Sequence, residues 1–320
     1  MLSKIKFKDE WDELCPIYRK IDSYKTFEQI GTGILINMLD SVFLLTASHV
    51  IDFIYEENDK LFIPTEDDFH LIEGELFHNP LTYSDRFKNP TEYRKNDNVD
   101  FSYYRLSLSF ISKICKQYIP LKENQIDFSS NFSLNLFQNN IEQNTRVSHI
   151  KNKIREYREI EYSDEEINLM DDIKINITIT FAGYPLTKTR YVNGQFKSEI
   201  IYYHGIALNE SDYISNNYDV LVNILAEFGK KGSLNSNFQF INSPKKDGIS
   251  GGGVYKIIRT DNGFDRKLIG IAHQKDEKKH LLIGTNINHC IKLMKEKQIM
   301  PYEVYQRLIS MTEMLFKIDE

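Results

Sequence analysis

Cysteine is scarce in this chain. Three residues, Cys15, Cys115 and Cys290, are spread over 320 positions. An odd and widely spaced set is not a disulfide framework, and without a Cys-x-x-Cys pair there is no recognisable cysteine site for zinc. The sequence therefore predicts three reduced thiols in a reducing compartment, and a fold held together by packing alone.

Long apolar runs are also missing. No run approaches the roughly 18 residues that a membrane-spanning helix requires, and residues 1–10 lack the apolar core of a secretory signal. The formal net charge is -6, so the chain has no global positive field with which to bind nucleic acid. We expect a cytoplasmic protein with no membrane and no nucleic-acid partner.

The residues that are present have a globular composition, 41% hydrophobic and 27% charged. At about 150 residues per domain, the length predicts two compact units. Residues 1–15 form a charged N-terminal extension, and short apolar runs separated by turn residues fill 16–120 and 173–286. Between these units, 121–172 is an irregular charged insertion, and helical spacing marks 287–320. This pattern predicts a mostly β fold of two antiparallel β-barrels, a large insertion and a C-terminal helix.

Turn signals predict two hairpins. Residues 33–37 and 41–46 flank Met38-Leu39-Asp40 and form the first. Residues 254–258 and 268–272 are separated by Asp261-Asn262-Gly263, a strong turn sequence, and form the second.

Three polar residues stand out against this background. His49 follows an apolar strand, Asp100 begins another, and Ser250 lies in the glycine-rich run Gly248–Gly253. A serine becomes nucleophilic beside an imidazole base, the imidazole needs a carboxylate to hold its tautomer, and the oxyanion needs backbone N–H donors. Each residue alone has an ordinary structural explanation, but together they predict an acyl-transfer site.

Other chemistries fit the sequence less well. No Gly-x-x-x-x-Gly-Lys-Ser/Thr run follows a strand, so a phosphate-binding loop is excluded. His273 and His280 lack the close partners of a zinc motif. The sequence therefore predicts no metal and no cofactor, while Asp97 remains an alternative to Asp100 as the carboxylate.

In these residues the chain resembles the chymotrypsin/trypsin-like serine protease family, particularly its bacterial, disulfide-free members. The chain order His49, Asp100, Ser250 is the order of that family. Thr46-Ala47-Ser48-His49 resembles its Thr-Ala-Ala/Ser-His signature, and Gly248-Ile249-Ser250-Gly251-Gly252 resembles its Gly-Asp/Asn-Ser-Gly-Gly.

Further segments extend the resemblance over roughly residues 16–118 and 173–300. Gly31-Thr32-Gly33 is similar to the hairpin strand before the histidine, and Gly183-Tyr184-Pro185 is similar to the start of the family's second barrel. The family's spacing to an apolar strand residue, here Leu106, favours Asp100 over its rival.

The resemblance implies a role for each site residue. His49 would act as general base and then general acid, Asp100 would orient it, and Ser250 would attack the scissile carbonyl of a protein or peptide. The backbone N–H groups of Gly248 and Ser250 would form the oxyanion hole. The implied fold is chymotrypsin-like, with two six-stranded barrels and the site in the cleft between them.

Departures from the family pattern bear on activation and specificity. Ile249 replaces the acid that pairs with a newly cut N-terminus, so classical zymogen activation is not expected. Pro244 occupies the pocket floor, where an acid would select Arg or Lys. Ala272 takes the place of a histidine that selects Glu or Gln, and His273 lies one position further, facing the other way unless a bulge intervenes. Three nearby lysines either favour an acidic substrate or are simply solvated: Lys245, Lys246 and Lys275.

Two functions follow. The first is a trypsin-like serine endopeptidase that is regulated or highly selective, and the second is a catalytically silent protease-like fold that serves as a binding or scaffold module. The insertion 121–172 is a candidate for gating the site or docking a regulatory protein, and a decorated surface loop is the alternative.

Overall fold

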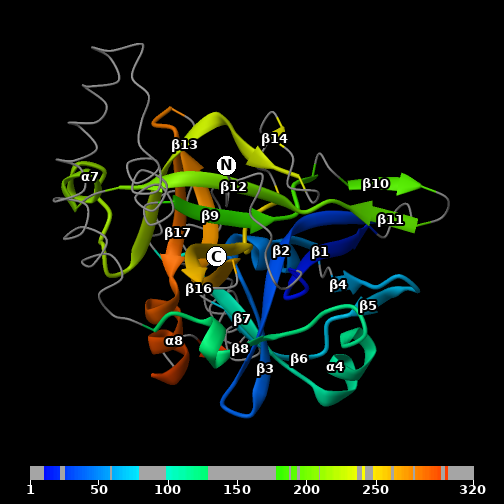
Figure 1. The fold of residues 1–320 in the computed structure, drawn as a ribbon. Coiled ribbons are helices and arrows are strands. Elements are labelled where there is room, and N and C mark those ends of the chain that lie inside the picture. The colour runs from blue at the N-terminus through cyan, green and yellow to red at the C-terminus, as the bar shows by residue number, and fades with distance from the viewer. Residues whose placement is uncertain are drawn as a thin grey trace, which may run out of the picture.

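The computed structural model describes thirteen stretches of the chain: residues 11–21, 26–57, 60–78, 99–128, 178–186, 189–192, 195–208, 210–235, 240–241, 248–260, 263–276, 278–296 and 300–301. Figure 1 shows two β-rich units packed against each other. Several predictions lie outside the described residues: Asp97, most of the insertion (129–172), Pro244, Lys245 and Lys246, and the chain after 301.

The first unit is a nine-stranded sheet in the order β18-β6-β7-β3-β2-β1-β4-β5, with β8 paired to β2 off this path. All its neighbouring strands are antiparallel except β2 and β8. Its strands are β1 (Leu14–Ile21), β2 (Thr26–Met38), β3 (Ser41–Thr46), β4 (Leu61–Pro64), β5 (Phe69–Leu71), β6 (Gly74–His78), β7 (Ser102–Leu106), β8 (Leu121–Lys122) and β18 (Met300–Pro301). Its helices are α1 (Ser48–Glu57), α4 (Leu108–Ile114) and the 3-10 turn η3 (Glu123–Gln125).

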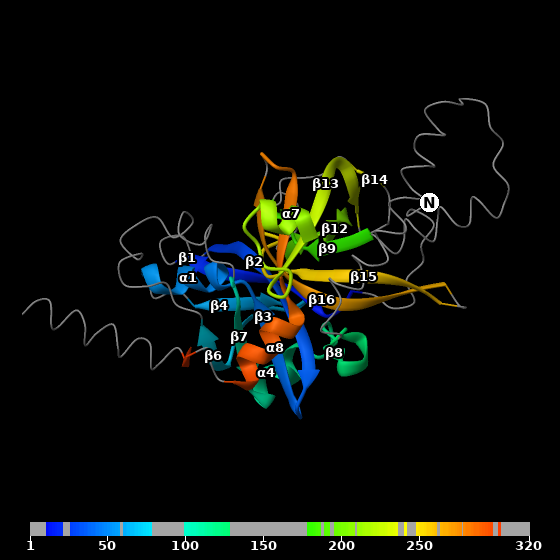
Figure 2. The ribbon, with the colours of Figure 1, turned by 90° about the vertical axis from the view of Figure 1, so that its left-hand side faces the viewer.

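The second unit contains a closed barrel. Its strands follow the order β12-β9-β15-β16-β17-β13, and pairing of β13 with β12 closes the ring, while β14 adds to β13. The long hairpin of β15 and β16 projects beyond the barrel (Figure 2). The elements are β9 (Thr178–Gly183), β12 (Ile201–Ala207), α7 (Glu210–Ser215), β13 (Asn223–Leu234), β14 (Phe240–Ile241), β15 (Gly253–Thr260), β16 (Gly263–Asp276), β17 (Leu281–Asn286) and α8 (Ile287–Lys295), with a separate ribbon of β10 (Thr189–Val192) and β11 (Gln195–Ser198).

The period-two alternation of the strands divides the core into layers. In β2, Leu35 packs inside the first unit, whereas Ile34 and Ile36 pack in the cluster between the units. In β12, Tyr203 packs inside the second barrel, whereas Tyr202 joins the central cluster. Successive side chains of a strand point to opposite faces, so strands that are apolar on both faces are buried on both.

The central cluster also takes in both ends of the described chain. Trp11, which precedes β1, is 7% exposed and belongs to this cluster, as do Ile287 and Ile291 of α8. The region predicted as an N-terminal extension therefore supplies a core residue. The helix α8 contacts β16 and β17 and covers one side of this cluster.

The predicted fold class is confirmed: the protein is mostly β, with two largely antiparallel β-units and a C-terminal helix. The second barrel is closed by six strands, whereas the described strands of the first unit form an open sheet. Both predicted hairpins are present, as β2–β3 and β15–β16. None of the described helices has the length and apolar character that crossing a membrane demands.

Candidate active site

The pairing of β3 with β7 explains how Asp100 reaches His49. Thr46, the last residue of β3, lies opposite Ser102, the first residue of β7. In an antiparallel pair, the residues that follow a given position on one strand lie opposite the residues that precede its partner on the other strand. The residues just after Thr46 therefore lie beside those just before Ser102, which places Asp100 next to the start of α1, where His49 is the second residue.

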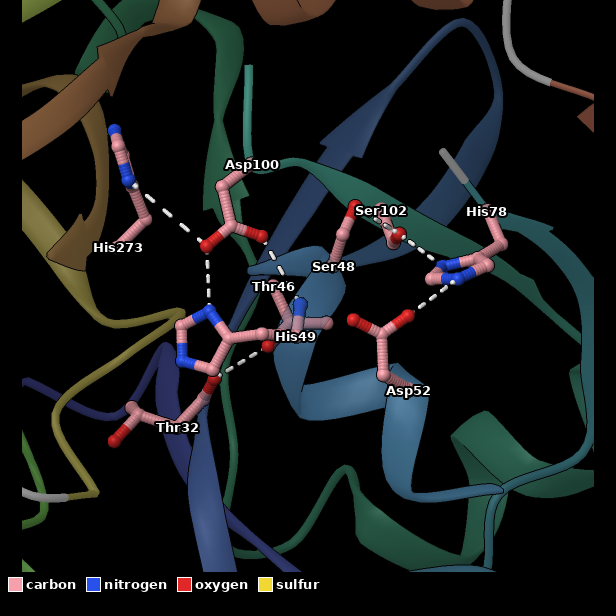
Figure 3. A network of polar contacts seen from close by, with 9 residues as sticks. All are labelled: Thr32, Thr46, Ser48, His49, Asp52, His78, Asp100, Ser102 and His273. Carbon is pink, nitrogen blue, oxygen red and sulfur yellow. Dashed lines mark hydrogen bonds and ion pairs between the residues drawn. The ribbon is translucent and has the colours of Figure 1, made fainter. Parts of the chain in front are cut away.

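His49 and Asp100 make two hydrogen bonds. The His49 Nδ1–Asp100 Oδ2 distance is 2.5 Å, and the His49 backbone N–H donates to Asp100 Oδ1 at 3.0 Å (Figure 3). Since an ionised carboxylate only accepts hydrogen bonds, Nδ1 carries the hydrogen, and in the neutral ring the lone pair is then on Nε2. The His49 side chain is 21% exposed and that of Asp100 is 1% exposed, so the imidazole is open to solvent while its carboxylate is buried.

Thr32 of β2 joins the turn that carries Ser250 to the first unit. The Thr32 backbone N–H donates to Ser250 O at 2.8 Å, and the Thr32 hydroxyl donates to Gly248 O at 2.8 Å. The Thr46 hydroxyl in turn donates to Thr32 O at 2.8 Å. The Ser250 turn therefore rests on the two strands that lead to His49.

Two glycines of this turn have backbone conformations that other residues rarely adopt. Gly248 has φ 94° and Gly251 has φ 84°. A Cβ on Gly251 would lie 2.1 Å from both Thr32 O and Thr46 Oγ1, so only glycine allows the turn to come this close to the first unit. Among the described residues, neither the Gly248 nor the Ser250 amide donates a hydrogen bond, which leaves both N–H groups available to a ligand.

His273 lies on a β-bulge in β16. Ala272 pairs with Gly284 and Gln274 pairs with Ile283, so His273 is the extra residue. Its side chain is fully buried, and its Nδ1 lies 3.9 Å from Asp100 Oδ2, the same oxygen that His49 Nδ1 contacts (Figure 3). The sequence suggested His273 as a pocket residue reached through a bulge. The bulge exists, and it aims the ring at Asp100 inside the protein.

The described residues include His49, Asp100, Gly248, Ser250, Ala272 and His273 of the predicted site. The structure brings His49 and Asp100 into direct contact and places the turn of Ser250 on Thr32 of β2. Ala272 is buried beside this turn, and its N–H donates to Gly252 O at 2.7 Å. The sequence interpretation missed Thr32 as the residue that docks the turn, although its Gly31-Thr32-Gly33 motif had marked the position. In the described part of the chain no three His, Cys, Asp or Glu side chains gather as a metal site would require.

Among known proteins, the chain shows similarity in structure but not in sequence. No protein family and no curated protein sequence matches the chain. Among solved structures it is similar to a catalytically active tobacco etch virus protease with product (TM-score 0.40, 11% identity, covering 93% of this chain and 86% of that one) and to a catalytically inactive form with substrate (TM-score 0.39, 11% identity, 90% and 84%). It is also similar to tobacco vein mottling virus protease (TM-score 0.39, 10% identity, 88% and 81%). Scores this low say nothing about activity or substrate.

Proposed function

We propose that the chain is a serine endopeptidase that cleaves protein or peptide substrates through an acyl-enzyme. The observation that carries the proposal is the His49 Nδ1–Asp100 Oδ2 contact of 2.5 Å, supported by the docking of the Ser250 turn on Thr32 of β2. A solvent-accessible imidazole whose Nδ1–H is held by a buried carboxylate is the arrangement a general base requires. The two free amides of Gly248 and Ser250 support an oxyanion hole on the same turn.

The proposed reaction has two halves. Ser250 Oγ attacks the scissile carbonyl carbon while His49 Nε2 takes the hydroxyl proton, and the resulting oxyanion accepts hydrogen bonds from the Gly248 and Ser250 amides. The C–N bond then breaks, His49 gives its proton to the leaving amine, and an ester on Ser250 remains. Water attacks this ester with His49 again as base, the carboxylic acid product leaves, and Ser250 regains its proton.

Asp100 does not exchange protons in this scheme. Its buried carboxylate keeps His49 in the productive tautomer and stabilises the imidazolium that forms in each half-reaction. The residues present require no metal or cofactor for these steps.

Replacement of the nucleophile tests the proposal. We expect Ser250→Ala to abolish labelling by a fluorophosphonate probe and to reduce cleavage by at least about 10³-fold, because the attacking oxygen is lost. Proteome-wide profiling of new N-termini, wild type against Ser250→Ala, measures cleavage and reads the substrate preference together.

An exposed serine supplies the matched control. Ser112 on α4 donates only to Ser109 O, and Ser112→Ala should leave probe labelling unchanged. If the wild-type chain resists the probe and produces no new N-termini, the endopeptidase proposal fails, and the silent binding or scaffold module becomes the better explanation.

A further inference from the structure

A second chain of buried polar side chains lies directly behind the candidate site. Asp52 Oδ1 is 3.0 Å from His78 Nε2, His78 Nδ1 is 2.7 Å from Ser102 Oγ, and Ser102 Oγ is 2.7 Å from Ser48 Oγ (Figure 3). Ser48, His78 and Ser102 are 0% exposed and Asp52 is 7% exposed. We call these four residues the buried network.

Strand register brings the buried network together. Phe77 of β6 pairs with Tyr103 of β7, so the next residues on either side, His78 and Ser102, are also neighbours across the two strands. Ser102 itself pairs with Thr46 at the end of β3, beside the first residue of α1. One turn further along α1, Asp52 faces His78.

Hydrogen-bonding chemistry gives the buried network a direction. Asp52 as a carboxylate only accepts, so His78 Nε2 carries a hydrogen and donates to it. In the neutral ring, Nδ1 then accepts from the Ser102 hydroxyl, which in turn accepts from the Ser48 hydroxyl. The network therefore links both ends of the first turn of α1 to β6 and β7 through one continuous hydrogen-bonded path.

Its position relative to His49 and Asp100 suggests what it does. His49 lies between the network residues Ser48 and Asp52 on α1, and Asp100 lies two residues before Ser102. All four residues of the path are buried, so the network is not a second active site.

We propose that the buried network positions His49 against Asp100. By tying α1 to β6 and β7, it sets the 2.5 Å distance between His49 Nδ1 and Asp100 Oδ2. Its effect on catalysis rests on the proposed endopeptidase function, but its effect on this distance does not. The four side chains are thus positioning residues, since they touch neither the substrate nor the reacting atoms.

Ser102→Ala tests the proposal, because it removes one oxygen from the middle of the path and adds no bulk. A short imidazole–carboxylate hydrogen bond gives a far-downfield proton resonance, which reports the His49–Asp100 geometry with or without activity. We expect this resonance to move upfield or broaden in Ser102→Ala. We also expect kcat on a peptide substrate to fall on the order of 10- to 100-fold with KM unchanged, since small misplacement of a catalytic group has effects of this size.

The second unit offers a matched control. Thr180 Oγ1 and His204 Nδ1 form another buried hydroxyl–imidazole pair, 2.8 Å apart. Thr180→Val breaks this pair without changing side-chain shape and should leave both the resonance and kcat as in the wild type. A Ser102→Ala protein with an unshifted resonance and a kcat within twofold of wild type would overturn the positioning role.

Two further measurements keep the test decisive. If Ser102→Ala does not fold, Ser48→Ala removes only the last hydroxyl of the path, and the same resonance should shift in the same direction; an unshifted signal counts against the proposal. If the wild type cleaves no peptide, the endopeptidase function fails, while the resonance still decides whether the buried network sets the His49–Asp100 distance.

Discussion

Asp100 is the residue on which the site converges. Its two carboxylate oxygens receive the Nδ1 and the backbone N–H of His49, and His273 approaches from the other unit. A buried carboxylate is costly unless hydrogen bonds and neighbouring charges compensate it. Here the hydrogen bonds at 2.5 and 3.0 Å both come from His49, and the proximity of His273 makes the environment of Asp100 depend on how the two units meet.

His204 offers a prediction on pH at the residue scale. Burial lowers the pKa of His204 to about 4, because the charged imidazolium is poorly solvated inside the second unit. The unfolded chain, with an ordinary histidine pKa near 6.5, binds more protons than the folded chain between pH 6.5 and 4. His204 therefore stabilises the fold fully above pH 6.5, and this contribution is lost as the pH falls toward 4.

We expect this histidine to account for about 3 kcal/mol of the stability lost between pH 7 and pH 4. Urea unfolding of wild type and His204→Gln at several pH values measures it, and the variant should show a shallower dependence by that amount. Parallel curves for the two proteins would contradict the prediction.

At the scale of elements, the site depends on register more than on any single contact. The β3–β7 pairing puts Asp100 beside His49, the β6–β7 pairing puts His78 beside Ser102, and the bulge in β16 turns His273 inward. A one-residue slip in any of these pairs would send the side chains concerned to the opposite face.

The turn of the β2–β3 hairpin has residue types that fit its backbone conformation poorly, which lowers stability. Leu39 and Asp40 both have positive φ, 51° and 54°, the conformation of a type I′ turn that Asn-Gly favours. We expect the double change Leu39→Asn with Asp40→Gly to raise the free energy of unfolding by about 1–2 kcal/mol, because a left-handed backbone costs other residues about that much.

Ser41, the first residue of β3, is the control for this change. Glycine within a strand is unfavourable, so Ser41→Gly should lower the free energy of unfolding by roughly 0.5–1 kcal/mol. Chemical denaturation of the two variants measures both effects. A loss of stability in the double variant would show that the positive φ angles at Leu39 and Asp40 do not reduce the free energy of unfolding.

At the scale of the whole molecule, the segment before β1 connects the two units. Glu13 forms an ion pair with Arg266 of β16 at 3.1 Å and accepts a hydrogen bond from Tyr255 of β15 at 2.7 Å. The Arg266 guanidinium lies over the ring of Trp11, 4.1 Å from its centroid. This buried cluster fixes the start of the first unit to β15 and β16 of the second unit.

Removal of the Glu13 carboxylate tests how much this cluster contributes to the free energy of unfolding. Glu13→Ala leaves a buried guanidinium without its counterion, which typically costs about 3–5 kcal/mol. Fluorescence of Trp11, the only tryptophan, can follow the unfolding. The double change Glu13→Ala with Arg266→Met should recover part of the loss, because an apolar replacement leaves no uncompensated charge; a double variant no more stable than the single one would contradict this account.

The sequence alone was enough to predict the fold class and both hairpins, and to name His49, Asp100 and Ser250 as candidates. These features depend on local signals: alternation along a strand, turn residues, and short motifs around one reactive side chain. The N-terminal segment was harder to interpret. It is rich in charged residues, which predicts exposure, but Trp11 and Glu13 are buried by residues distant in the sequence.

Only the tertiary structure decided how the units close and what surrounds the site. Four features join residues that are far apart in the chain: closure of the second barrel, docking of the Ser250 turn by Thr32, the inward turn of His273 and the buried network. Thr32 and Gly248, for example, are 216 positions apart. Such contacts arise from strand register and from the packing of one unit on another. Neither strand register nor packing between units produces a repeating pattern in the sequence. The neighbours of histidines such as His78 and His273 are therefore known only from the folded chain.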